Sequence, residues 1–317
     1  MSAKALGSEF GPLARWRYAV KPASWPKLLV PCALGQAMGL AHSGSLRADG
    51  LLLGAGFTVA GLLFIVLLND WGDREIDALK RRLFPDDCSP KTIPDAILGA
   101  GALLWAGSAA GALALCCAWL GGHYLGRPLL GPAAVLGLAV FWAYSLPPLR
   151  LNYRGGGELL EMFGVGLLLP WLNAYLQTGA VFYSALWPLP GFALLSLASA
   201  LASTLSDEVS DRQGGKTTLA TRSGNAVVRR AVEWLGPLGL FSYLPGAWLA
   251  GGAGLLLLSL PAVILGALHY RALRVESPAA VTLGFAAQGR YKLHLHRLIW
   301  HSGLWVALAS VVGAALP

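Results

Sequence analysis

Long apolar runs dominate this chain and leave few folds open to it. A helix needs about 20 mostly apolar residues to cross the hydrocarbon core of a bilayer. Stretches of that kind recur along the chain, and short polar segments separate them. The pattern predicts an all-α polytopic membrane protein with nine transmembrane helices, at residues 26–43, 51–69, 96–120, 129–146, 157–177, 184–206, 228–249, 253–272 and 298–316.

The amino-acid composition supports a membrane protein. Of the 317 residues, 56% are hydrophobic and 13% are charged, whereas a soluble domain carries about 25% charged residues. So few charges cannot cover a soluble protein of this size, which excludes a soluble enzyme, a disordered regulator and a disulfide-stapled secreted domain. No linker or low-complexity tract divides the chain. We therefore expect a single domain over residues 1–317, with residues 1–25 as a cytoplasmic N-terminal segment.

The basic residues fall almost entirely on one side of the predicted membrane. With nine spans, 22 of the 24 Lys and Arg residues lie in the N-terminal segment and in the loops after the even-numbered spans. Arg47 and Arg127 lie on the other side. Because cytoplasmic loops are enriched in Lys and Arg, we expect the chain in the inner (cytoplasmic) membrane, with a cytoplasmic N-terminus and an external C-terminus. This bias also explains the net charge of +8 without nucleic-acid binding.

An acidic motif follows the second predicted span. If that helix continues past residue 69, a turn of 100° per residue places Asp70, Asp73 and Asp77 within an arc of about 60°, with Asn69 beside it. Three carboxylates on one face repel each other and are costly to desolvate. Mg²⁺ binds such oxygen ligands, typically one or two carboxylates together with substrate phosphates. The motif therefore predicts a magnesium site.

A second acidic motif follows the sixth predicted span, on the same side of the membrane. Asp207 and Asp211 are spaced i, i+4 and share a helix face. Gly214 and Gly215 are expected to end this helix, which places Lys216 on a turn with free backbone N–H groups. Together with Lys91 near the first motif, this arrangement predicts a Mg²⁺–diphosphate site at the mouth of a lipophilic cavity.

Other polar residues are expected to have ordinary roles. The remaining acids near the two motifs should be solvated loop charges, balanced by nearby Lys and Arg. Three histidines near the last span are expected to face the lipid headgroups. The acids are Glu75, Asp86, Asp87, Asp95 and Glu208, and the histidines are His294, His296 and His301.

These motifs resemble those of the UbiA-type intramembrane prenyltransferase superfamily. Asn69-Asp70-x-x-Asp73-x-x-x-Asp77 matches the family's first motif, NDxxDxxxD, and Asp207-x-x-x-Asp211 with Gly215-Lys216-x-Thr218-Leu219 is similar to its second. The resemblance covers roughly residues 20–225. Three further segments carry it: Lys21-Pro22-x-Ser24-Trp25, Tyr144-Ser145-x-Pro147-Pro148 and Arg154-x-x-Gly157-Glu158. The loop after the first motif departs from the family, with Cys88-Ser89-Pro90-Lys91-Thr92-Ile93-Pro94 in place of Arg-Pro-Leu-Pro, so it does not indicate the acceptor.

The resemblance implies a nine-helix bundle around a central cavity that holds Mg²⁺ and an isoprenyl diphosphate, with the prenyl chain in a lipid-open tunnel. It also implies a role for each motif residue. Carried over by position, the Mg²⁺ ligands are Asp70, Asp73 and Asp77 on one side and Asp207 and Asp211 on the other, and the diphosphate contacts are Asn69, Lys91 and Lys216.

The chemistry that follows is prenyl transfer to an aromatic or quinone-precursor acceptor. An allylic diphosphate ionises when Mg²⁺ and cationic groups neutralise its leaving group, and an electron-rich ring then attacks the cation. Asp73, Tyr144 and Glu158 are the candidates to hold the acceptor or to take the ring proton. A UbiA-type terpene cyclase, in which the cation closes on its own double bonds, remains an alternative. A secondary transporter is less favoured, because transporter sites usually lie near the bilayer midplane.

Overall fold

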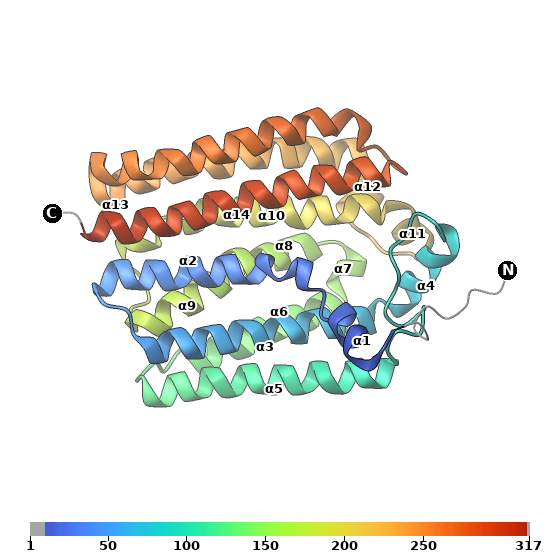
Figure 1. The fold of residues 1–317 in the computed structure, drawn as a ribbon, viewed down its shortest axis with the longest axis horizontal. Coiled ribbons are helices and arrows are strands. Elements are labelled where there is room, and N and C mark those ends of the chain that lie inside the picture. Colours follow the sequence, from blue (N-terminus) through green and yellow to red (C-terminus); the bar gives the residue numbers. More distant parts are fainter. Residues whose placement is uncertain (1–9, 316–317) are drawn as a thin grey trace.

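The structure is a computed structural model that describes residues 10–315, and its long helices lie side by side in one bundle (Figure 1). The only β-type pairing among these residues is an isolated bridge between Arg154 and Thr217. The predicted all-α class is therefore confirmed. The bundle contains α2 (Pro26–Ser43), α3 (Ala48–Gly72), α5 (Ala100–Tyr124), α6 (Leu130–Ser145), α8 (Gly157–Glu161) with η3 (Met162–Leu168) and α9 (Leu169–Thr178), α10 (Leu189–Ser203), α13 (Asn225–Glu276) and α14 (Phe285–Ala315).

Six helical stretches among the described residues are long and apolar enough to cross a membrane. The longest, Asn225–Ala279, contains two residues with non-helical backbone angles, Gly251 and Gly252. This break lies where the sequence predicts the boundary between the seventh and eighth spans. Helix α6 has 16 residues and is shorter than a full span, and α2 is not among the six. The total of nine spans thus stays a prediction, which requires that α2, α6 and both halves of α13 also cross.

The last helix is much longer than the sequence predicts. Helix α14 begins at Phe285, whereas the apolar run that predicts the span begins at residue 298. Its first half is helical because it packs one face against α13, where Gln288, Tyr291 and Leu295 are buried. The other face exposes Arg290 and Arg297, so mean hydropathy underestimates the length of the helix.

Small residues let the helices approach closely. A Cβ on Gly35 of α2 would clash with the carbonyl oxygen of Pro170 in α9, and a Cβ on Gly39 would clash with the side chain of Gln177. Close approach of this kind is the usual way in which helices associate in a membrane, where lipid tails are as apolar as the helices.

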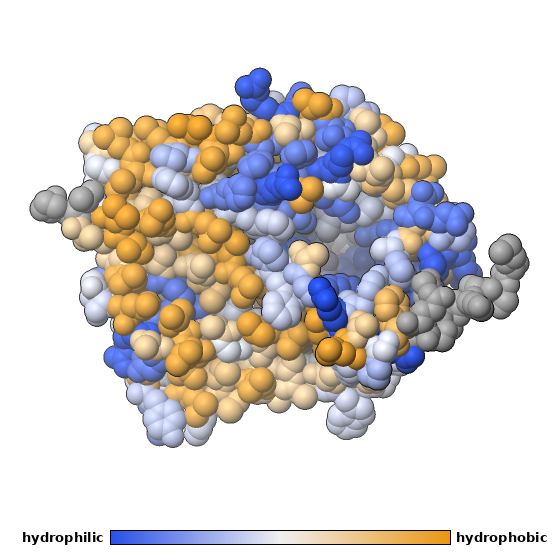
Figure 2. Space-filling view, viewed as in Figure 1, coloured by the Kyte–Doolittle hydropathy of each residue, from blue (hydrophilic) through white to orange (hydrophobic). Residues whose placement is uncertain are grey.

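Short helices gather at one end of the bundle, where the described chain begins, and the last turn of α14 lies at the opposite end (Figure 1). In Figure 2, apolar side chains cover most of the bundle's length, and hydrophilic ones concentrate toward the end with the short helices. This polar end carries both acidic motifs. Its assignment to the cytoplasm remains a prediction from the charge bias. The short helices are α1 (Pro12–Ala19), α4 (Arg74–Leu83), α7 (Leu151–Arg154), α11 (Glu208–Gln213) and α12 (Leu219–Ser223).

Candidate active site

The first acidic motif spans a break between two helices. Helix α3 ends at Gly72 and α4 begins at Arg74, and Asp73 between them has φ −94° and ψ 6°. The expectation of one continuous helical face for the three aspartates is therefore wrong. The physical reason is that α4 is strongly charged and packs on α11 at the polar end instead of continuing the apolar α3.

Asp73 lies in the wall of a large cavity and has several polar partners. The Tyr153 hydroxyl donates to its Oδ1 at 2.8 Å, and the Asn69 amide donates to its Oδ2 at 3.5 Å. The Lys216 Nζ lies 3.6 Å from the same Oδ2. Burial and the adjacent Asp73 raise the pKa of Tyr153, so the hydroxyl keeps its proton and acts as a donor.

Asp70 and Asp77 do not line the cavity, and each is held by a lysine. Asp70, only 3% exposed, pairs with Lys21 and accepts the hydroxyl of Thr92 at 2.6 Å. Lys91 Nζ lies 2.6 Å from Asp77 Oδ1. Burial raises the pKa of Asp77 in spite of Lys91. Burial also disfavours the charged form of Lys91, but Asp77 and Asp207 outweigh it and raise the pKa of Lys91.

The second acidic motif begins at another helix junction. Helix α10 ends at Ser203, a 3₁₀ turn follows, and Asp207 precedes α11. Helix α11 ends before Gly214, and Gly215 has φ +73°, as expected for the turn that presents Lys216. Lys80 from α4 forms an ion pair with Asp207, which ties the two motifs together.

Asp207 and Asp211 differ in their electrostatic surroundings. Burial disfavours ionisation of Asp207, but Lys80 and Lys292 outweigh it and lower its pKa. Asp211 is 2% exposed, its Oδ1 has no hydrogen-bond partner, and Lys216 Nζ is 4.0 Å from its Oδ2. Burial, assisted by Asp207 and Asp73, raises the pKa of Asp211 to about 7 in spite of Lys216. A cation beside Asp211 would stabilise its ionised carboxylate and offset the cost of burying that charge.

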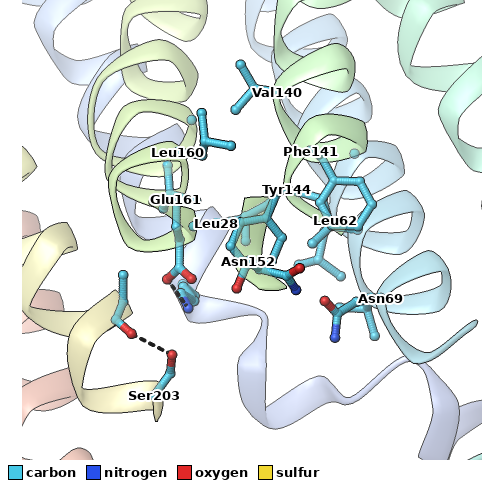
Figure 3. A pocket seen from close by; sticks show the side chains of 18 of the residues that line it. Leu28, Leu62, Asn69, Val140, Phe141, Tyr144, Asn152, Leu160, Glu161 and Ser203 are labelled. Carbon is cyan, nitrogen blue, oxygen red and sulfur yellow. Dashed lines mark hydrogen bonds and ion pairs between the residues drawn. The ribbon is translucent and has the colours of Figure 1, made fainter. Parts of the chain in front are cut away.

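One cavity of about 390 Å³ connects these groups. Its wall changes character along its length, from a polar mouth at the end with the short helices to an apolar body between α3, α6 and α9. Figure 3 shows Asn69, Tyr144, Asn152 and Glu161 around the same space at the mouth. The mouth cluster, as we name it, consists of Asp73, Asp207, Asp211 and Lys216, and the body includes Leu28, Phe57, Leu62, Phe141, Leu169 and Leu172.

The mouth cluster fits a cation that is shared with a ligand. Within residues 10–315, no three His, Cys, Asp or Glu side chains are grouped closely enough to hold a metal ion by themselves. The three carboxylates of the mouth cluster nevertheless face the cavity, and Asp211 Oδ1 lacks any partner. This matches Mg²⁺ coordination by one or two carboxylates completed by phosphate oxygens and water.

The two other predicted catalytic residues also line the cavity. Tyr144 stacks against Phe141, with ring centroids 6.3 Å apart. The backbone N–H of Leu219 donates to Glu158 Oε1 at 2.9 Å, which connects α8 to the segment after the second acidic motif. Glu161, one turn further along, pairs with Lys27 of α2. Tyr144, Glu158 and Asp73 therefore surround one space.

The sequence analysis did not identify several residues of the site. The distribution of lysines could have identified some of them. Six of the chain's seven lysines have their contacts at this end of the cavity, and the seventh, Lys4, lies outside the described residues. Tyr153 and Thr92 carried no signal, since a hydroxyl beside a carboxylate is recognised only in three dimensions. The six lysines are Lys21, Lys27, Lys80, Lys91, Lys216 and Lys292.

Two acids and one histidine differ from expectation. Glu208 and Asp95 are 5% and 8% exposed and are not solvated, because Arg212 and Thr282 hold Glu208 and Arg81 holds Asp95. His296 does not face the headgroups. It lines a small side pocket between α2, α10 and α14, with Ser199 Oγ 3.4 Å from its Nε2.

Comparisons with known proteins agree with this architecture. The chloroplastic chlorophyll synthase of Oryza sativa subsp. japonica is 30% identical over 161 residues. These residues cover 48% of this chain and 39% of that relative, so the match spans less than half of either protein.

Solved structures share the fold at low sequence identity. A UbiA homologue from Archaeoglobus fulgidus bound to GPP and Mg²⁺ aligns with a TM-score of 0.67 at 14% identity, covering 92% of this chain and 99% of that one. An apo UbiA homologue from Aeropyrum pernix K1 gives a TM-score of 0.66 at 15% identity, covering 90% and 96%. The profile of the UbiA prenyltransferase family matches residues 28–287, and the chain belongs to this family.

Proposed function

We propose that this protein transfers an isoprenyl chain from an isoprenyl diphosphate to an aromatic or quinone-precursor acceptor within the membrane, in a Mg²⁺-dependent reaction. One observation carries the proposal: a single cavity joins a mouth of aspartates and lysines to an apolar body. An isoprenyl diphosphate has the same two parts in the same order. A homologue of the same fold has been solved with GPP and Mg²⁺.

The mouth cluster would bind the diphosphate end. Asp73, Asp207 and Asp211 face the cavity and would hold Mg²⁺, which supplies charge neutralisation of the leaving diphosphate when bound. Lys216, between Asp73 and Asp211, would pair directly with the diphosphate oxygens. Asn69, already beside Asp73, would donate its amide.

Asp70, Asp77 and Lys91 belong to the same proposal, although they lie behind the cavity wall. Lys91 would exchange its contact with Asp77 for a diphosphate oxygen, and Lys21 would do the same at Asp70. The carboxylates of Asp70 and Asp77 would then join the magnesium ligands. These ion pairs thus keep buried carboxylates compensated before the donor binds.

The cavity body would control the allylic cation. As the C–O bond breaks, its electron pair leaves with the diphosphate, and the apolar wall keeps water from the cation. The ring faces of Tyr144 and Phe141 can stabilise the positive charge. A ring carbon of the acceptor supplies the electron pair for the new C–C bond, and its proton passes to Asp73 or Glu158. The Tyr144 hydroxyl would orient the acceptor.

The charge bias of the sequence supports an orientation with the cavity mouth on the cytoplasmic side of the membrane. In that orientation a water-soluble diphosphate group reaches the mouth from the cytoplasm, and the prenyl chain enters from the bilayer. The proposed donor can therefore bind without carrying its charges across the membrane.

The test is an assay of purified protein in detergent with Mg²⁺, prenyl diphosphates and a panel of aromatic and quinone-precursor acceptors, read by mass spectrometry. Since one relative is a chlorophyll synthase, the panel includes a chlorophyll precursor. We expect an acceptor-dependent product that disappears in Asp207→Ala and persists in Asp49→Ala, a matched change in the first turn of α3, away from the cavity mouth. Cyclic products without acceptor would instead identify a terpene cyclase, and untouched diphosphate would reject both activities.

A further inference from the structure

Helices α13 and α14 lie together at one edge of the bundle, away from the main cavity (Figure 1). Both helices are long and apolar enough to cross a membrane, so their outer surface is expected to meet lipid. Helix α14 presents one continuous exposed face there, whose members are spaced three or four residues apart. The members are Arg290, Leu293, Arg297, His301, Leu304 and Leu308.

This exposed face changes from polar to apolar at His301. Arg297 and His301 lie on the side of the polar end, and Leu304 and Leu308 follow with 46% and 50% of their surface exposed. Figure 2 shows hydrophilic side chains over α13 and α14 as far as about the middle of the bundle, with apolar surface beyond them. A phospholipid has the same parts in the same order, a charged phosphate followed by acyl chains.

His301 also has a partner on the neighbouring helix. Its Nδ1 lies 2.8 Å from Nε2 of His269 on α13. This hydrogen bond uses one nitrogen of each ring, and neither ring has a second hydrogen bond within residues 10–315. The edge patch, as we name it, consists of His269, Arg297 and His301.

The edge patch lies unusually deep for polar residues on a lipid-facing surface. The last turn of α14 lies at the end of the bundle opposite the short helices (Figure 1). Counted from Ala315, His301 is about 21 Å and Arg297 about 27 Å along the helix, whereas the hydrocarbon core of a bilayer is about 30 Å thick. A flat hydrocarbon layer that begins at Ala315 would therefore immerse both side chains, which is costly unless a polar partner accompanies them.

No carboxylate of the described chain supplies that partner. Two acids near the polar ends of these helices are already paired, Glu233 with Arg274 and Glu276 with Arg290. Arg297 forms no ion pair within residues 10–315. The titratable groups that are close enough to influence His269 are all basic, namely His294, Arg297 and His301. The edge patch is therefore complementary to an anion.

We infer that the edge patch binds the phosphate of an anionic phospholipid, whose acyl chains lie along Leu304 and Leu308. The Arg297 guanidinium presents forked donors that fit phosphate oxygens, and the second ring nitrogen of His301 can donate to the same group. Since the patch has no acid, it favours an anionic headgroup over a zwitterionic one, whose own cation would be repelled by Arg297. The phosphate is thereby drawn below the level at which a headgroup ordinarily lies.

The experiment measures lipid binding to the full-length protein in detergent, by native mass spectrometry and by thermal unfolding. Phosphatidylglycerol is titrated against phosphatidylcholine with the same acyl chains. The variants are Arg297→Gln and Arg297→Gln/His301→Leu, in which leucine suits a side chain that faces lipid. Arg230→Gln is the matched control, because Arg230 is an exposed arginine of α13 that bonds only the Ala226 carbonyl of its own helix.

We expect the wild type and Arg230→Gln to bind phosphatidylglycerol at least about fivefold more tightly than phosphatidylcholine. Arg297→Gln should weaken the binding of phosphatidylglycerol about fivefold, the effect of one Arg or Lys beside an anionic surface. The double variant should bind the two lipids equally. Thermal unfolding without added lipid should be similar in all variants, since the substituted side chains are exposed.

Three results would overturn this inference. Equal binding of the two lipids by the wild type, or an equal loss in Arg230→Gln, would reduce the effect to general attraction between basic residues and headgroups. Inorganic phosphate that stabilises the wild type as much as phosphatidylglycerol does would identify a site for a soluble anion. A dimer that dissociates in the double variant, with lipid binding unchanged, would assign the patch to a second copy of the chain. None of these measurements depends on turnover, so each leaves the proposed function untouched.

Discussion

Two polar clusters interrupt the apolar bundle, and they are built in opposite ways. One is the mouth cluster. The other, the amide cluster, consists of the buried residues Gln36, Thr58, Asn173 and Gln177, of which Thr58 lines the cavity. The mouth cluster is charged, and it leaves Asp211 Oδ1 without a hydrogen-bond partner. The amide cluster is neutral, and its amide groups are all paired. Asp211 is as deeply buried as the amides, so desolvation does not distinguish it from them.

This difference in hydrogen bonding distinguishes a candidate binding site from a polar contact that holds helices together. Buried polar groups are normally paired, and an exception calls for an explanation such as a ligand or an ion. The unpaired oxygen and raised pKa of Asp211 are what the proposed cation site would show before a cation binds. Fully paired amides are expected where polar side chains only hold neighbouring helices together. Removing a polar group should therefore cost activity in the mouth cluster and stability in the amide cluster.

The largest effect is expected at the mouth. Asp211→Asn should lower turnover about 100-fold or more, the scale seen when one charge-stabilising group is removed from an active site. Its stability should change little, because the variant removes a buried charge that burial already disfavours. The measurement is turnover together with thermal unfolding in detergent. Asp49→Asn, half-exposed at the far end of α3, is the control; equal losses in both variants would argue against a mouth-specific role.

Ligand binding should stabilise the protein through the mouth alone. Mg²⁺ with inorganic pyrophosphate at 100 times its dissociation constant should add about 2.7 kcal/mol to the free energy of unfolding. Chelation with EDTA should remove this gain, and Asp211→Asn should reduce it. Thermal unfolding with and without each component provides the measurement. A gain that survives EDTA would show that the pyrophosphate binds without the metal.

The sequence predicts the parts of this molecule that depend on local pattern. Apolar length predicts α2 at residues 26–43, as observed, and motif spacing brings Asp73, Asp207 and Asp211 to one cavity. The break at Asp73 was not predictable, because it depends on how the charged α4 packs on α11. The hydrogen bond from Tyr153 to Asp73 was not predictable either, because the two residues are 80 positions apart in the sequence.

The amide cluster shows a signal that was present but not used. Asn173 and Gln177 are spaced i, i+4 within an apolar span, and Gln36 stands alone in another. Polar residues inside a membrane segment usually face the bundle interior. That rule predicts that these residues are buried together, but only the structure shows which helices they join.

In the amide cluster, a substitution should lower stability and leave the chemistry unchanged. Asn173→Leu removes the side-chain oxygen that accepts from the Gln36 amide and the Cys32 thiol, and it should lower the free energy of unfolding by about 1–3 kcal/mol. The KM for the prenyl diphosphate of the folded fraction should stay within about twofold. Ser310→Ala, a buried hydroxyl in α14 that bonds only its own helix, is the control. A loss of diphosphate affinity equal to that of Lys216→Met would contradict the separate roles of the mouth cluster and the amide cluster.

The smallest effect is expected at Tyr153, and it tests whether a hydrogen bond positions Asp73 in the mouth cluster. Tyr153→Phe removes one hydrogen bond to Asp73 and keeps the ring that Arg150 and Lys216 pack against. A single neutral donor to a carboxylate is worth about 1.5 kcal/mol, so we expect turnover to fall about tenfold or less at saturating donor, with little change in thermal stability. The effect should depend on Asp73: in an Asp73→Asn background, Tyr153→Phe should cost almost nothing further. Additive losses in the double variant would mean that Tyr153 acts on the substrate directly and not through Asp73.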